Sequence, residues 1–205
     1  MDFLNDGIKV FVILWALIDP VGTIPVFLAV SKQHPPTDFS RLAFRAVCIA
    51  WLVLIFFMTT GEFILNAMEI PLSAFQVSGG IILFLFALTM IFGESKPEEE
   101  VNMAKSFKDT SVFPLAMPSI ASPGAIMGIV LLTEKRSASF EAQLMVAALM
   151  TVILLITFVL LYSSKYIDRL IGDSGASLLS RVMGLIICAI AVKYVLDGIK
   201  LYFQL

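Results

Sequence analysis

Long apolar runs alternate with short polar stretches along the whole chain. A run of about 20 apolar residues is long enough to cross the hydrocarbon core of a bilayer as a helix. The pattern therefore predicts an all-α integral membrane protein with six transmembrane helices, in a single domain over residues 1–205. The predicted spans are Ile8–Val30, Leu42–Leu65, Ser73–Phe92, Thr110–Thr133, Phe140–Ser163 and Arg181–Phe203.

The first and fourth spans contain residues that interrupt a helix. The first carries Asp19-Pro20-Val21-Gly22-Thr23 and then Pro25, and the fourth carries Pro114, Pro118 and Ser122-Pro123-Gly124. Proline removes a backbone donor and clashes with the preceding turn, and a carboxylate at mid-depth costs about 2.5–3.5 kcal/mol on insertion scales. Broken backbone is tolerated in a membrane only where it faces protein or a wet cavity. We therefore predict that both spans are broken at these motifs and that the breaks build a site.

The two broken spans also resemble one another in sequence. Residues 22–31 lie against residues 124–133 at a shift of 102, although Pro20 and Pro123 are out of register by one. Spans three and six align at a shift of 104. Because each half holds three spans, which is an odd number, the second half must enter the membrane inverted. The predicted organisation is repeat one over 1–93, a polar connector over 94–109 and repeat two over 110–205.

The basic residues predict how the spans are oriented. The loops after spans one, three and five hold nine Lys and Arg residues, whereas the opposite side holds five. Cytoplasmic loops carry the excess of basic residues in membrane proteins. We therefore expect both the N-terminus and the C-terminus on the periplasmic side.

Composition narrows the class of protein further. Hydrophobic residues make up 59% of the chain and charged residues 15%, against about 25% charged in an ordinary soluble domain, so a water-soluble fold is excluded. The net charge of −2 gives no reason to expect nucleic acid as a partner. Cys48 and Cys188 lie in apolar runs and are predicted to be packing residues. His34 is the one histidine and lies in a polar loop, which argues against a histidine metal site.

The motifs resemble those of the MarC family of bacterial inner-membrane proteins, also described as neutral amino-acid transporters. The resemblance rests on residues 19–27, on Pro114-Leu115-Ala116-Met117-Pro118 and on residues 122–126, and it extends over essentially the whole chain. It implies the same six spans, a bacterial inner-membrane location and a transport role. The second motif of the family usually reads glycine-proline-glycine. Here Ser122 replaces the first glycine, which changes the local turn or adds a hydroxyl to the site.

The two motifs are suited to binding a small zwitterion. Half-helices that begin at Gly22 and Gly124 would present backbone N–H groups and positive dipole ends to a carboxylate. Asp19 would receive the substrate ammonium, a sodium ion or a proton. The predicted function is thus a secondary transporter of small neutral amino acids or similar small zwitterionic metabolites, driven by a proton or sodium gradient, without a cofactor. The predicted substrate- and ion-binding residues are Asp19, Pro20, Gly22, Thr23, Ser119, Ser122, Pro123 and Gly124.

Alternatives remain open from the sequence. Asp19 could only cap the half-helix after Pro20, with its carboxylate accepting the amides of Gly22 or Thr23. A channel also uses broken helices and backbone carbonyls. A non-transporting membrane scaffold or regulatory protein would need no substrate. An enzyme is not expected, because only Asp19 lies deep in a span and an aspartyl hydrolase needs two carboxylates that share a proton.

The predicted partners are the lipid bilayer and a small-molecule substrate. The small residues around Gly79, Gly80 and Gly184 could pack helices within the chain or join copies of it in a homo-oligomer. Lys193 and Asp197 lie four residues apart on span six and are predicted to form a local ion pair.

Overall fold

The computed structural model describes residues 2–31, 35, 38–92, 110–134 and 140–204. The regular elements in these ranges are all helices, which confirms the predicted all-α class for the described part of the chain. They are α1 (Asp2–Ile18), α2 (Thr23–Ser31), α3 (Phe39–Ala67), α4 (Leu72–Phe92), η2 (Ser111–Ile120), α6 (Pro123–Glu134), α7 (Phe140–Tyr162) and α8 (Ser164–Phe203). The predicted polar connector 94–109 and His34 lie outside the described residues.

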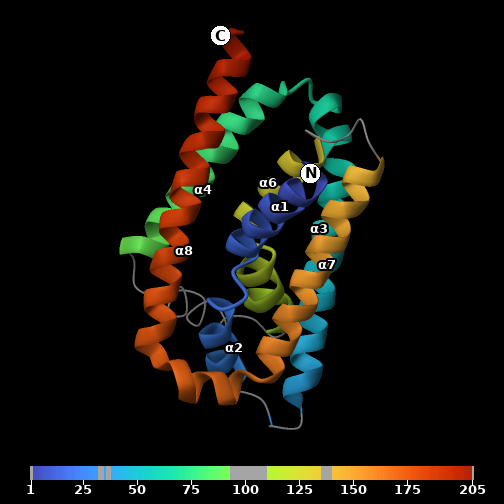
Figure 1. Cartoon of the computed structure of the whole chain (residues 1–205). Coiled ribbons are helices and arrows are strands. Elements are labelled where there is room, and N and C mark those ends of the chain that lie inside the picture. The colour runs from blue at the N-terminus through green and yellow to red at the C-terminus, as the bar shows by residue number, and fades with distance from the viewer. Residues whose placement is uncertain (1, 32–34, 36–37, 93–109, 135–139, 205) are drawn as a thin grey trace.

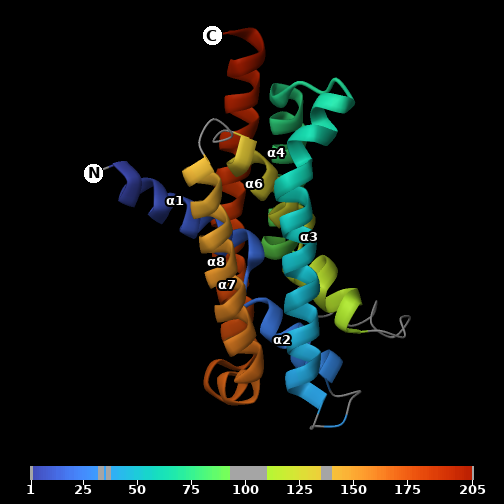
Figure 2. The ribbon, with the colours of Figure 1, turned by 90° about the vertical axis from the view of Figure 1, so that its right-hand side faces the viewer.

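Four of these helices are long and apolar enough to cross a membrane, namely α3, α4, α7 and the Arg181–Phe203 part of α8. η2 and α6 together can form a fifth crossing, which is bent by 54° at the break between them. The first apolar run is divided into α1 and α2, and Figure 2 shows α1 steeply inclined to α3 and α7. The predicted breaks in runs one and four are therefore present, while the count of six crossings remains a prediction.

The long helices form two pairs, α4 with α8 and α3 with α7, and Figure 1 shows the shorter elements between these pairs. Among the contacts that hold the shorter elements, α1 packs on α7, α2 packs on α8, and η2 packs on α3. Each broken run therefore contacts long helices that the other half of the chain contributes.

α8 is longer than the sixth span that the sequence predicts. A polar loop is expected between spans five and six, whereas the helix runs over 40 residues from Ser164 to Phe203. The polar part of this segment contains no proline, and a helix satisfies its own backbone N–H and C=O groups. Figure 1 shows the helix bending at its lower end before it continues along α4.

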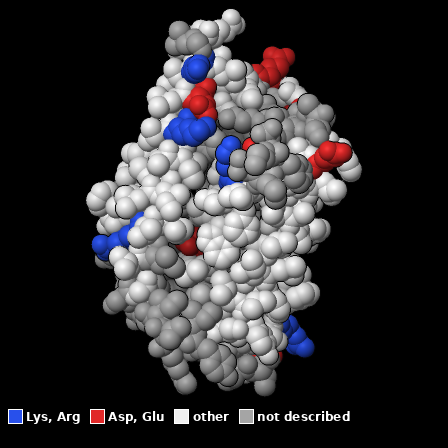
Figure 3. Space-filling model, in the orientation of Figure 1, with Lys and Arg blue, Asp and Glu red and all other residues white. Residues whose placement is uncertain are grey.

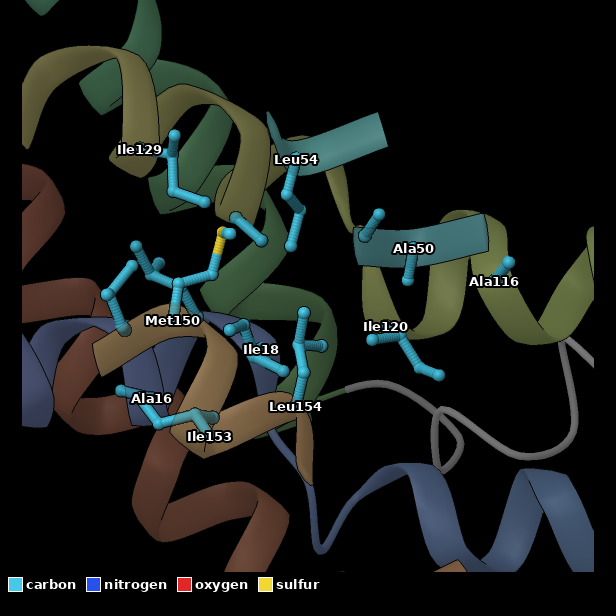
Figure 4. Close-up of a cluster of buried hydrophobic side chains, with 14 of the residues drawn as sticks. Ala16, Ile18, Ala50, Leu54, Ala116, Ile120, Ile129, Met150, Ile153 and Leu154 are labelled. Carbon is cyan, nitrogen blue, oxygen red and sulfur yellow. The ribbon is translucent and has the colours of Figure 1, made fainter. Parts of the chain in front are cut away.

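The apolar core lies where the broken elements meet the long helices. Figure 4 shows side chains from α1, η2, α6 and α7 directed toward one another, with α3 beside them. Lipid tails are as apolar as leucine, so close packing holds these elements together. The fully buried members drawn there include Ile18, Leu54, Ile120, Ile129, Met150 and Ile153.

Small residues let α4 and α8 approach closely. A Cβ atom at Gly80 would lie 2.8 Å from the carbonyl oxygen of Ala191, and a Cβ atom at Gly184 would lie 3.2 Å from that of Ala87. Gly80 has no room for a side chain unless the helices move apart, and at Gly184 the contacts would be tighter than usual. The predicted packing role of Gly80 and Gly184 therefore operates within the chain.

The outer surface of the described residues carries many large apolar side chains. Leu52, Leu155 and Leu196 are each about 60% exposed, as expected of residues in contact with lipid tails. The face drawn in Figure 3 is mostly uncharged, with its charged side chains in a few separate groups. The predicted local ion pair is confirmed, since Lys193 Nζ lies 2.7 Å from Asp197 Oδ2.

Candidate functional site at the junction of the two broken runs

The break between α1 and α2 is centred on Asp19. The amide of Asp19 still donates to the carbonyl oxygen of Trp15 at 3.0 Å, which completes the last turn of α1. Pro20 has no N–H group, and a proline disfavours the right-handed helical conformation of the residue before it. Asp19 accordingly adopts the left-handed conformation, with φ of 49°, which aspartate tolerates better than most residues. α2 starts anew with the amide of Thr23 donating to the carbonyl oxygen of Asp19 at 3.2 Å.

The side chain of Asp19 is buried and folds back over the start of α2. Asp19 is 2% exposed, and its Oδ1 accepts a hydrogen bond of 3.0 Å from the amide of Gly22. Gly22 is needed for this approach, because a Cβ atom there would collide with the carboxylate of Asp19. The hydroxyl of Thr23 donates to the carbonyl oxygen of Asp19 at 3.0 Å. The capping interaction considered for Asp19 is therefore present.

The break between η2 and α6 is built around Ser122. Within η2, the residues that precede Pro114 and Pro118 are extended, as expected before proline, so this segment is an irregular helix. α6 then begins with Ser122 as its N-cap. The Oγ of Ser122 accepts a hydrogen bond of 3.0 Å from the amide of Ala125. Pro123 follows at the first helical position, where its missing N–H group is not needed.

The two breaks share one kind of capping hydrogen bond. In each, a side-chain oxygen of the residue before a proline accepts the amide three positions later, from Asp19 to Gly22 and from Ser122 to Ala125. These pairs are related by a shift of 103, which brings Pro20 into register with Pro123. The sequence alignment pairs Gly22 with Gly124, whereas the capping hydrogen bonds pair Gly22 with Ala125, one residue further along.

Hydrogen bonds connect the two breaks to each other. The hydroxyl of Ser122 donates to the carbonyl oxygen of Leu17 at 3.1 Å, and that of Ser119 donates to the hydroxyl of Thr23 at 3.4 Å. Leu17 belongs to the last turn of α1, where carbonyl groups lack intrahelical partners. Thr23, Ser119 and Ser122 are all fully buried. The result is a polar cluster inside an apolar protein, with contributions from both halves of the chain.

The structure brings most of the predicted site residues together. Hydrogen bonds join Asp19, Gly22, Thr23, Ser119 and Ser122, either directly or through the backbone. Pro20 and Gly124 are buried at the same breaks, whereas Pro123 is exposed.

The backbone amides expected to bind a substrate carboxylate are occupied by groups of the protein. Gly22 and Thr23 donate to Asp19, and Ala125 donates to Ser122. The sequence also gave no indication of the roles of Leu17 and Ala125, because they act through backbone atoms. Leu17 lies two residues before Asp19 and Ala125 directly follows Gly124, and this closeness to the predicted breaks is the signal that could have pointed to them.

The family model described as "MarC family integral membrane protein" matches residues 4–203. The UPF0056 membrane protein of Aquifex aeolicus is 30% identical over 197 residues, which cover 94% of this chain and 92% of that protein. The UPF0056 membrane protein of Buchnera aphidicola subsp. Baizongia pistaciae is 31% identical over 98% of this chain and all of its own length. The UPF0056 inner membrane protein YhgN of Escherichia coli K12 is 33% identical over 201 residues, covering 98% of this chain and all of that protein. No solved structure matches the chain.

Proposed function

Because this chain belongs to the MarC family of integral membrane proteins, we propose that it is a secondary transporter of small neutral amino acids or similar small zwitterionic metabolites. A proton or sodium gradient drives the transport, and the protein carries out no enzymatic reaction. The chain lies in a bacterial inner membrane, a location that the name of YhgN gives for that relative. It crosses the membrane six times, as two inverted three-helix repeats with both termini in the periplasm.

The observation that carries this proposal is a buried carboxylate at the junction of two broken helices. Asp19 is 2% exposed and lies where α1 ends and α2 begins. Ionisable groups within membrane-spanning segments are costly and mark substrate or ion pathways. A buried carboxylate is stabilised by a cation, which here is the ammonium of a zwitterion, a sodium ion or a proton.

The arrangement of the halves supports an inverted repeat. α2 and α6 both start at the hydrogen-bonded junction, and in Figure 1 α2 lies in the lower part of the molecule and α6 in the upper part. α1 packs on α7, and η2 packs on α3, so the contacts are exchanged between the halves. Broken helices that meet between inverted repeats are the usual binding site of secondary transporters.

The caps supply a way to couple the ion to the substrate. Oδ1 of Asp19 accepts a hydrogen bond from the amide of Gly22. A substrate carboxylate would need this same donor. A proton or sodium ion on Asp19 weakens this carboxylate as an acceptor and releases the amide. The substrate carboxylate then takes the amide of Gly22, and the hydroxyls of Thr23 and Ser119 lie beside it. Ion binding thereby favours substrate binding at the same junction.

The test is uptake of labelled small amino acids into proteoliposomes under imposed proton or sodium gradients. Asp19→Asn keeps an oxygen acceptor for the amide of Gly22 but removes the charge. Asp6→Asn is the matched control, because Asp6 forms an ion pair of 3.6 Å with Lys9 at the surface. We expect saturable, gradient-driven uptake by the wild type and by Asp6→Asn, and none by a folded Asp19→Asn. Equal uptake by Asp19→Asn, or no uptake by the wild type of any amino acid under either gradient, would contradict the proposal.

A further inference from the structure

Gln76 is a buried polar side chain that the junction does not use. It lies on α4, it is 1% exposed, and its Oε1 has no hydrogen-bond partner among the residues that the structure describes. Buried polar atoms in native proteins are almost always hydrogen-bonded, so this oxygen calls for a partner that the described residues do not supply. In a membrane protein this requirement is stricter, because lipid offers no donor.

Gln76 lies on a face of α4 that packs on α8 and, one turn further along, on α6. On the α8 side, a Cβ atom at Gly198 would lie 3.1 Å from the Cβ of Gln76. On the α6 side, Gly79 follows Gln76 by one turn, and a Cβ atom there would lie 2.5 Å from the Cε of Met127. Figure 1 shows α4 alongside α8, with α6 next to them in the interior.

The same face of α4 leads from Gln76 to the junction. Leu83 follows Gln76 by two turns, and its Cδ2 lies 2.8 Å from the place that a Cβ atom of Gly124 would take. Gly124 is in the first turn of α6, directly after Ser122 and Pro123. At a rise of 1.5 Å per residue, Gln76 and Leu83 are separated by about 10 Å along the helix. Gln76 therefore lies about two helical turns from the junction, toward the end of the molecule where α4 begins.

We propose that the carboxamide of Gln76 is a second binding position for the transported solute, on a path between α4 and α6 that leads to the junction of the broken runs. Its Oε1 accepts a hydrogen bond from the ammonium group of the solute. This assignment rests on the proposed transport function and adds a residue far from either broken motif.

Met127 separates the two binding positions. The tip of its side chain lies against Gly79, between the levels of Gln76 and Leu83 on α4. Methionine is unbranched and adapts its shape easily, so its side chain can move aside while the backbone stays in place. Because Gly79 has no side chain, there is space for the methionine in this position. Met127 thus closes the path between Gln76 and the junction when no solute passes.

The first test compares Gln76→Leu with Gln143→Leu, the same change at a partly exposed glutamine on α7. We expect kcat/KM for uptake to fall on the order of tenfold or more in Gln76→Leu, the fold-change of one lost polar contact. Gln143→Leu keeps the wild-type value. The thermal unfolding midpoint of Gln76→Leu stays equal to that of the wild type or rises, since no hydrogen bond to the described protein is lost. Gln76→Met, which keeps the unbranched shape, repeats the comparison if the leucine variant does not fold.

Normal uptake by Gln76→Leu, with uptake abolished in Asp19→Asn, would overturn this inference and leave the proposed function intact. Absence of uptake by the wild type would overturn both. If uptake and the unfolding midpoint both fall in each of the two Gln76 variants, Gln76 has a structural role. This outcome would also overturn the inference.

The second test asks directly whether solute and water reach this position. Gln76→Cys is prepared in a chain where Cys48 and Cys188 are replaced by serine, and it is treated with a small hydrophilic thiol reagent in proteoliposomes. We expect the reagent to label the cysteine, and a saturating transported amino acid to slow the labelling. Failure to label, or labelling at the same rate with and without solute, would show a closed core position and contradict the inference.

Discussion

The hydroxyl of Ser122 donates a hydrogen bond of 3.1 Å to the carbonyl oxygen of Leu17, although the two residues lie 105 positions apart in the chain. The same hydroxyl oxygen accepts the amide of Ala125 at 3.0 Å. One small side chain therefore satisfies a carbonyl at the end of α1 and an amide at the start of α6. Both groups would otherwise be buried without a partner in an apolar surrounding.

Ser122→Ala is expected to destabilise the protein by about 1–3 kcal/mol, because it removes the cap of α6 and leaves the carbonyl of Leu17 unsatisfied. Ser122→Thr keeps the hydroxyl and serves as the control. Unfolding of the purified variants, followed by circular dichroism in detergent, measures the difference. Equal stability of the alanine and threonine variants would mean that the bond to Leu17 contributes nothing.

Gly22→Ala is expected to disrupt the first break. A Cβ atom at this position collides with the carboxylate of Asp19, so the cap must open, at a cost of about 1–3 kcal/mol. Gly7→Ala is the matched control, because a Cβ atom there meets only Met145 Sδ at an ordinary 3.7 Å. Alanine is a better helix former than glycine, so Gly7→Ala leaves the unfolding midpoint unchanged or raises it. A Gly22→Ala variant as stable as Gly7→Ala would contradict the close approach of Asp19 to Gly22.

Substitutions of Asp19 should separate its structural role from its charge. Asn keeps an acceptor for the amide of Gly22 and tolerates the left-handed conformation, so Asp19→Asn is expected to fold as well as the wild type. Asp19→Ala loses the cap and strains the backbone at a φ of 49°, with an expected cost of about 2 kcal/mol. Unfolding midpoints of the two variants in detergent test this order, and an alanine variant more stable than the asparagine variant would refute it.

Gly79 and Gly80 are adjacent, yet alanine should be tolerated at one and not at the other. A Cβ atom at Gly80 meets the backbone of α8, at 2.8 Å from the oxygen of Ala191, and backbone cannot move aside. A Cβ atom at Gly79 meets the flexible tip of Met127. We expect Gly80→Ala to cost about 1–3 kcal/mol and Gly79→Ala under 1 kcal/mol. The two unfolding midpoints check this, and equal values would show that α4 and α8 are less tightly packed than described.

Much of this architecture could be predicted from local sequence signals. Apolar runs define α3, α4, α7 and the later part of α8, since length and hydropathy alone decide whether a helix can cross a bilayer. Proline and the residue before it act on their own backbone, so the breaks at Pro20 and Pro123 could be placed from the sequence. The same motifs also indicated the family to which the chain belongs.

Other features were decided only by the tertiary structure. The break in the first run was predicted, but the direction of α1, which inclines to pack on α7, was not. The polar segment before Arg181 is helical, although the sequence has no strong signal for the start of a helix there. The sequence alignment of the two repeats pairs Gly22 with Gly124. The capping hydrogen bonds instead pair Asp19 with Ser122.

The physical reason is that a membrane chain is apolar on the faces that touch lipid and also on the faces that touch protein. Hydrophobic periodicity therefore does not reveal which face of α4 is buried, or that Gln76 lies on that face. The sequence by itself determined where the apolar helices form and where two of the apolar runs break. Only the fold decided which polar atoms meet, such as Ser122 and Leu17, because that depends on the packing of segments more than 100 residues apart.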